Sequence, residues 1–147
     1  MSLELPLLLQ YKNIHVLDRY SKDFPDNKMT AEEAFEELVK FFWLSLKHQE
    51  EKLCFPENNE FDFICGIHSE MKEIDDMWHT FLLFTKDYIS FCQQYLGRFF
   101  HHSPNTETEA EQITQNDFEL DFSRFLSYVY DSLGEETLVK WFGVLIE

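Results

Sequence analysis

The segment from Asp75 to Pro104 holds most of the side chains in this chain that could do chemistry. It reads DDMWHTFLLFTKDYISFCQQYLGRFFHHSP, and its candidate metal ligands are Asp75, His79, Cys92, His101 and His102. Carboxylate, imidazole and thiolate groups are ligands for zinc, and for iron where oxygen and nitrogen dominate. The segment therefore presents a candidate metal site whose assembly depends on the path of the chain.

Two other interpretations of these residues need no metal. Asp75 and His79 are four positions apart, on one face of a helix, so they can pair directly as a buried carboxylate and imidazole. Cys92 would then be a small apolar core residue, and the two later histidines would fasten a loop. Alternatively, Cys92 could be a nucleophile with His79 as its base, but its apolar neighbours and the acidic chain disfavour this. Because neither HExxH nor CxxC is present, the sequence favours the buried pair.

A helix break near Phe84 decides whether these residues can meet. A straight helix rises 1.5 Å per residue and would hold His79 and Cys92 about 20 Å apart, too far to share an ion. With a break, Thr85 would be the N-cap of a new helix, and Asp87 would lie in its favourable first turn. We expect this break and the hairpin that it creates.

A second reversal at Gly97 would then return the chain towards the hairpin, because glycine is the usual residue just past a helix C-terminus. The predicted outcome is one cluster containing His79, Cys92 and the His101–His102 segment.

Apolar spacing elsewhere predicts a compact all-α fold. A first helix is expected over about 7–23, and a second runs from a capping box at Thr30 to about residue 50. The stretch at about 51–69 is expected to be an irregular loop. Only 4 glycines and 4 prolines accompany 16 phenylalanines, which suits long helices packed through aromatic rings. We therefore predict a single helical domain over residues 1–147, a bundle of five to six helices.

The composition limits the classes of partner. A net charge of −16 argues against nucleic-acid binding and against anionic membrane surfaces, because both need clustered basic residues. No stretch approaches the roughly 18 apolar residues that a membrane span needs. The three cysteines contain no CxxC pair and suit reduced thiols, so we expect an acidic cytoplasmic protein.

The quoted segment resembles the signature of the glycine-rich domain-containing protein-like family. That signature reads roughly Val-Asp-Glu-Val-Trp-His-x-His-Ile-Leu, then a Tyr and a Cys, then Phe-Gly-x-Phe-x-His-His-x-Pro. The matching positions here are Asp75, Trp78, His79, Leu83, Tyr88, Cys92, Gly97, Phe99, His101, His102 and Pro104. The second histidine of the Trp-His-x-His pattern is Phe81 here, so a site that required it would lack a ligand. The glycine-rich region is absent, RNA binding is not carried over, and the resemblance implies no particular reaction.

The function that the sequence favours is a non-catalytic binding or interaction module, with a protein partner and a structural Asp–His–Cys–His cluster. The alternative is a zinc- or iron-binding protein, or a metal-dependent enzyme, that uses Asp75, His79 and Cys92 or His101/His102. We expect that the protein binds no cofactor, with zinc or iron as the alternatives. The sequence assigns no catalytic residue, no enzyme class and no oligomeric state, and it has no phosphate loop or GxSxG motif.

Overall fold

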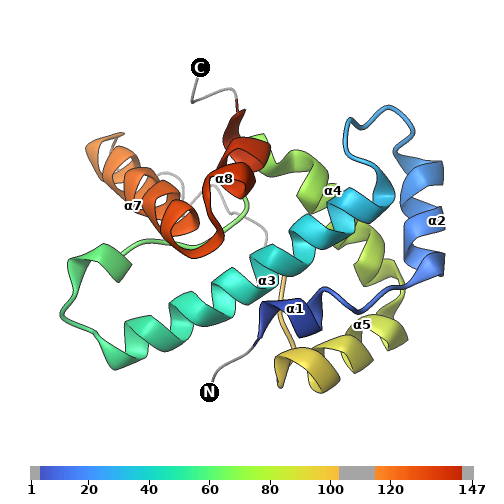
Figure 1. Ribbon diagram of the computed structural model, residues 1–147, viewed down its shortest axis with the longest axis horizontal. Helices are drawn as coiled ribbons and strands as arrows, with labels where there is room; N and C mark the ends of the chain where they lie inside the picture. Colours follow the sequence, from blue (N-terminus) through green and yellow to red (C-terminus); the bar gives the residue numbers. More distant parts are fainter. Residues whose placement is uncertain (1–3, 103–114, 144–147) are drawn as a thin grey trace.

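The computed structural model describes residues 4–102 and 115–143, and its regular structure there is entirely helical (Figure 1). The α-helices are α1 (Leu5–Leu8), α2 (Ile14–Asp23), α3 (Ala31–Cys54), α4 (Lys72–Leu83), α5 (Thr85–Phe91), α7 (Gln115–Leu133) and α8 (Glu135–Phe142). Two 3-10 turns, η1 (Asn59–Phe61) and η2 (Ser69–Met71), and a π-helical turn, η3 (Cys92–Leu96), complete the set. The all-α prediction is confirmed, although these described residues form seven α-helices rather than five or six.

Helix α3 crosses the middle of the molecule, and α1, α2, α4 and α7 all contact it (Figure 1). It begins as predicted, because the side-chain oxygen of Thr30 accepts a hydrogen bond from the Glu33 N–H at 3.1 Å. Most of its apolar side chains are buried, so this helix forms the centre of the core. It continues to Cys54, a little beyond the predicted end.

The single helix expected over about 7–23 is wrong, since α1 and α2 are separate helices. Asn13 is the reason: its side-chain oxygen accepts from the Val16 N–H at 3.3 Å and starts α2 there. The interruption places Tyr11 against the rings of Phe91 and Tyr95. The loop expected at about 51–69 is less irregular than predicted, because it contains η1 and leads into η2 and α4. Its residues form no strand.

The predicted break at Phe84 is present and separates α4 from α5. Its details differ from the prediction, because the N-cap of α5 is Phe84 itself, without a side-chain cap, rather than Thr85. Asp87 does lie in the first turn of α5, where it accepts a hydrogen bond from Asn13. The two helices bury aromatic rings against each other, with the ring centroids of Phe81 and Tyr88 5.0 Å apart.

Gly97 ends η3 with φ 79°, the left-handed conformation expected of a residue that reverses the chain. We expect Gly97→Ala to destabilise the protein by about 1–2 kcal/mol, the cost of placing an L-residue in this conformation. A Cβ at this position would meet no atom within 4 Å, so the cost is conformational and not steric.

Urea unfolding of Gly97→Ala and Gly66→Ala would check this prediction. Gly66 does not have a positive φ, and its added Cβ would make only an ordinary contact with Ile64, so it is the matched control. Equal loss of stability in the two variants would contradict the prediction.

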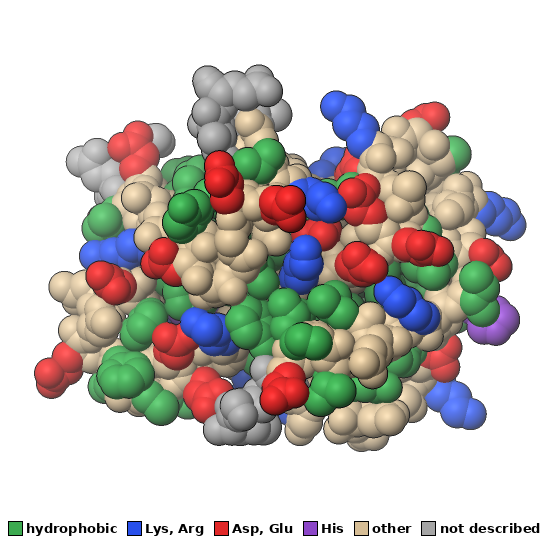
Figure 2. All heavy atoms as spheres, viewed as in Figure 1, with side chains coloured by type: hydrophobic (Ala, Val, Ile, Leu, Met, Phe, Trp, Pro, Cys, Tyr) green, Lys and Arg blue, Asp and Glu red, His purple; other side chains and the backbone are tan. Residues whose placement is uncertain are grey.

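The surface carries charges of both signs. On the face shown in Figure 2, acidic and basic side chains are interspersed with apolar ones, and the basic side chains do not gather into a patch. None of the helices in the described ranges is both long and apolar enough to cross a membrane.

Candidate metal site

Asp75, His79 and His102 come together where the chain after Gly97 returns to α4. Helix α4 supplies Asp75 and His79 one turn apart, as its spacing predicts. The Nε2 atom of His102 lies 2.6 Å from Asp75 Oδ1, and the Nε2 atom of His79 lies 3.7 Å from Asp75 Oδ2. The two imidazole centroids are 4.5 Å apart. One carboxylate therefore faces two histidines that come from different segments of the chain.

The geometry of these three residues is close to that of a metal centre. One ligand atom from each residue can be chosen so that all three lie within 4.8 Å of one another. Around an ion with nitrogen and oxygen ligands at about 2.0–2.2 Å, the ligand atoms are about 3 Å apart, so modest side-chain movement would suffice. The ion would replace the hydrogen bond between His102 and Asp75, because a metal binds an imidazole nitrogen that carries no proton.

The site lies at the surface, and its ligands differ in exposure. The side chain of His79 is 55% exposed, whereas those of Asp75 and His102 are 26% and 17% exposed. The expectation that His79 is a buried core histidine is therefore wrong. A bound ion would be reached by solvent from the His79 side.

Packing of residues 98–102, which we call the His102 arm, brings His102 to this position. The Phe100 ring packs against both Phe42 and Trp78, at 5.3 and 5.5 Å between centroids. The imidazole of His102 packs on Trp78 at 4.2 Å. Trp78 was expected to be a core residue and is buried, but it also forms one wall of the site.

The other two predicted ligands do not join the cluster. Cys92 is completely buried, and its thiol contacts the backbone of Phe100 and the hydroxyl of Tyr88. Burial raises the pKa of the Cys92 thiol, so both a ligand role and a nucleophilic role are disfavoured. His101 is exposed and packs edge-on against Phe99 at 4.6 Å. Of the five candidate ligands, the structure thus brings together Asp75, His79 and His102 and leaves Cys92 and His101 apart from them.

Tyr88 has a role that the sequence did not predict. Its hydroxyl accepts a hydrogen bond from Trp78 Nε1 at 3.0 Å and donates one to the carbonyl of Phe100. Burial raises the pKa of Tyr88 well above its ordinary value, so the group stays a neutral hydroxyl. The only sequence signal for this residue was its match to the tyrosine of the family signature.

A family model described as UCP032817-like matches residues 13–125, which includes α4, α5 and the His102 arm. The chain belongs to the UCP032817-like family. The description of this family names no activity, and it makes no mention of glycine-rich domains. No curated protein and no solved structure matched the chain. In this UCP032817-like protein, all three residues of the cluster lie within the matched span.

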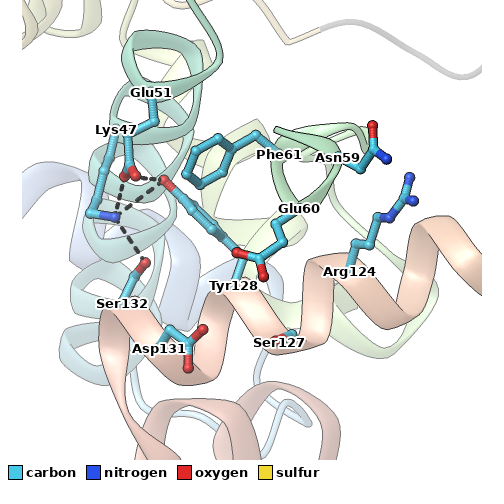
Figure 3. Close-up of a pocket in the computed structure, with 10 residues that line it drawn as sticks. All are labelled: Lys47, Glu51, Asn59, Glu60, Phe61, Arg124, Ser127, Tyr128, Asp131 and Ser132. Carbon is cyan, nitrogen blue, oxygen red and sulfur yellow. Dashed lines mark hydrogen bonds and ion pairs between the residues drawn. The ribbon is translucent and has the colours of Figure 1, made fainter. Parts of the chain in front are cut away.

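A separate groove of about 350 Å³ lies between α3, η1 and α7 (Figure 3). Lys47 crosses one end, where it pairs with Glu51 and donates to Tyr128 and Ser132. The hydroxyl of Tyr128 also donates to Glu51 at 2.7 Å. The remaining lining residues are Asn59, Glu60, Phe61, Arg124, Ser127 and Asp131. None of the candidate ligands lines this groove, so it is distinct from the candidate metal site.

Proposed function

We propose that this protein binds a divalent transition metal, zinc(II) or iron(II), through Asp75, His79 and His102. The observation that carries the proposal is the convergence of one carboxylate and two imidazoles within 4.8 Å, from two separate segments. Two histidines with one carboxylate hold zinc in catalytic sites and iron(II) in non-haem oxygenases. Because a set of three protein ligands leaves coordination positions free, the ion would be accessible to water or a small molecule.

The exposure of His79 supports a metal more than a purely structural cluster. The hydrogen bond between Asp75 and His102 is enough to fasten the His102 arm to α4. His79 is more than half exposed and adds nothing comparable to that contact. Its position beside both other side chains is accounted for by a shared ion.

Metal uptake by protein purified without a metal-affinity step tests the proposal. We expect close to one equivalent of zinc or iron by elemental analysis, and one equivalent of zinc in a titration of metal-free protein against a chromophoric chelator. His102→Ala is expected to lose this uptake, because one of only three ligands is removed.

His101→Ala is the matched control, since it removes a neighbouring imidazole that packs on Phe99 and lies outside the cluster. Uptake that is absent in the unmodified protein, or equal in the His101 and His102 variants, would contradict the proposal. Loss of uptake in the His102 variant alone would support it.

A protein-binding module is the second candidate, and the groove in Figure 3 is the observation that favours it. Glu60 and Asp131 lie exposed along it, and Leu53 and Phe55 expose apolar surface near η1. A partner with basic side chains would suit this groove and the net charge of −16. Reversing both rim charges, with Glu60→Lys and Asp131→Lys, would abolish such binding and leave zinc uptake unchanged.

We also propose that the chain is related to the glycine-rich domain-containing protein-like family. This relationship is supported by the matching residues that the structure describes, among them Asp75, Trp78, His79 and His102; Pro104 lies outside the described residues. No RNA-binding role is proposed from it.

A further inference from the structure

We infer that Tyr88 is a positioning residue for the metal site, one that sets metal affinity by holding His102 over Asp75. This inference rests on the proposed metal-binding function. Tyr88 would not touch the ion. Its buried hydroxyl joins the helix that supplies two ligands to the arm that supplies the third.

The Tyr88 hydroxyl makes one hydrogen bond to α4 and one to the His102 arm. Trp78 lies on α4 between Asp75 and His79, and its Nε1 atom donates to the Tyr88 hydroxyl. The same hydroxyl donates to the carbonyl of Phe100, two residues before His102. One buried oxygen atom thus connects the backbone of the arm to the helix that bears the other two ligands.

Cys92 reinforces the same anchor. Its thiol contacts the backbone of Phe100 and the Tyr88 hydroxyl from η3, one turn beyond Tyr88. Cys92 was predicted as a ligand or a structural residue of the cluster. Because Cys92 lies against the arm, we infer that it supports the position of His102 and is not a ligand.

The expected effect follows from the chemistry of metal ligands. An imidazole binds well only when its ring is oriented, and groups that orient ligands typically contribute 10–100-fold to metal affinity. Without the hydroxyl, the indole N–H of Trp78 and the Phe100 carbonyl both lose a buried partner. The arm would then shift to find other partners, and His102 would leave its place above Asp75.

Tyr88→Phe tests the inference, because it deletes the hydroxyl and keeps the ring that packs on Phe81 and Phe99. We expect zinc affinity, measured by chelator competition, to fall about 10–100-fold. In the metal-free protein, the imidazole ¹⁵N shifts of His102 should change because its bond to Asp75 is disturbed.

Tyr128→Phe is the matched control, since its buried hydroxyl bonds Glu51 in the groove, whose lining includes no residue of the His102 arm. It should lower unfolding stability to a similar extent and leave zinc affinity and the His102 shifts unchanged. An equal loss of affinity in the two tyrosine variants would overturn the inference, as would wild-type affinity in Tyr88→Phe.

Two further measurements keep the inference testable on its own. If the unmodified protein takes up no zinc, the proposed function fails, whereas unchanged His102 shifts in metal-free Tyr88→Phe would overturn the positioning role. Should Tyr88→Phe not fold, Cys92→Ala removes the second contact to the arm and is expected to weaken zinc binding by a smaller factor. Unchanged zinc affinity in that variant would overturn the inference.

Discussion

The Asp75→Ala variant is expected to lose tight metal binding and to be less stable than the unmodified protein even without metal. Asp75 is the only carboxylate of the cluster and faces both imidazoles. Zinc affinity should therefore fall by more than about a hundredfold, because removing a ligand costs more than removing a residue that only orients one. The same change leaves the half-buried His102 without its acceptor at 2.6 Å. That loss should cost about 1–3 kcal/mol of unfolding free energy.

A double-mutant cycle in metal-free protein separates the two contacts of Asp75. The pair of Asp75 and His102 should show a coupling energy of about 0.5–3 kcal/mol, because these residues are in direct contact. The pair of Asp75 and His79 should show less than about 1 kcal/mol, since His79 is exposed and 3.7 Å away. Additive effects of Asp75→Ala and His102→Ala would contradict this assignment, and so would a stronger coupling to His79.

Phe81→Ala should destabilise the protein by about 3–5 kcal/mol, the range found when a buried phenylalanine is truncated. Phe81 is completely buried where α4 meets the rest of the aromatic core. Its ring lies 5.3 Å from Phe35, 5.0 Å from Tyr88 and 5.4 Å from Phe91. The resulting cavity would be lined by rings from α3 and α5, which cannot collapse into it without moving whole helices.

Chemical denaturation with urea measures this effect, and Leu83→Ala on the same helix is its control. Leu83 is 59% exposed, so its truncation should change stability by no more than about 0.5 kcal/mol. A loss below about 1.5 kcal/mol for Phe81→Ala would contradict the packing described here, because even the removal of one or two buried methylenes approaches that value.

At Phe81, the sequence and the structure lead to different conclusions about the ligands of this site. In the family signature a histidine stands at this position, and its replacement suggested an incomplete ligand set. The structure turns Phe81 into the core and away from solvent, whereas His79 is exposed. The cluster that forms therefore draws its second imidazole from position 102.

The sequence could predict features that depend on neighbours a few positions apart. Thr30 begins α3 because its side chain reaches an N–H three residues ahead, and Asp75 and His79 share a face because a helix turns once in 3.6 residues. Gly97 reverses the chain because it adopts a positive φ. The break at Phe84 was predicted correctly, but the N-cap of α5 was not. Phe84 takes this position through its backbone, since its carbonyl accepts a hydrogen bond from the Tyr88 N–H and no side chain caps the helix.

Contacts between distant segments could not be predicted from the spacing of residues in the sequence. Asn13 caps the start of α2 and also donates to Asp87, a partner far along the chain. His101 and His102 are adjacent and chemically identical, so no local pattern distinguishes them. The rotation of the arm is set by the packing of the Phe100 ring on Phe42 and Trp78 and by the bond from Tyr88 to the Phe100 carbonyl. This rotation directs His102 to Asp75 and leaves His101 exposed.

By itself, then, the sequence determined the all-helical class, the start of α3, and the placement of Asp75 and His79 on one face of a helix. The tertiary structure alone decided that His102 completes the cluster and that Cys92 lies beneath it. The physical reason is that helical periodicity relates residues within a few turns. Residues separated by α5, η3 and the Gly97 reversal meet only through the packing of aromatic rings and the hydrogen bonds of Tyr88.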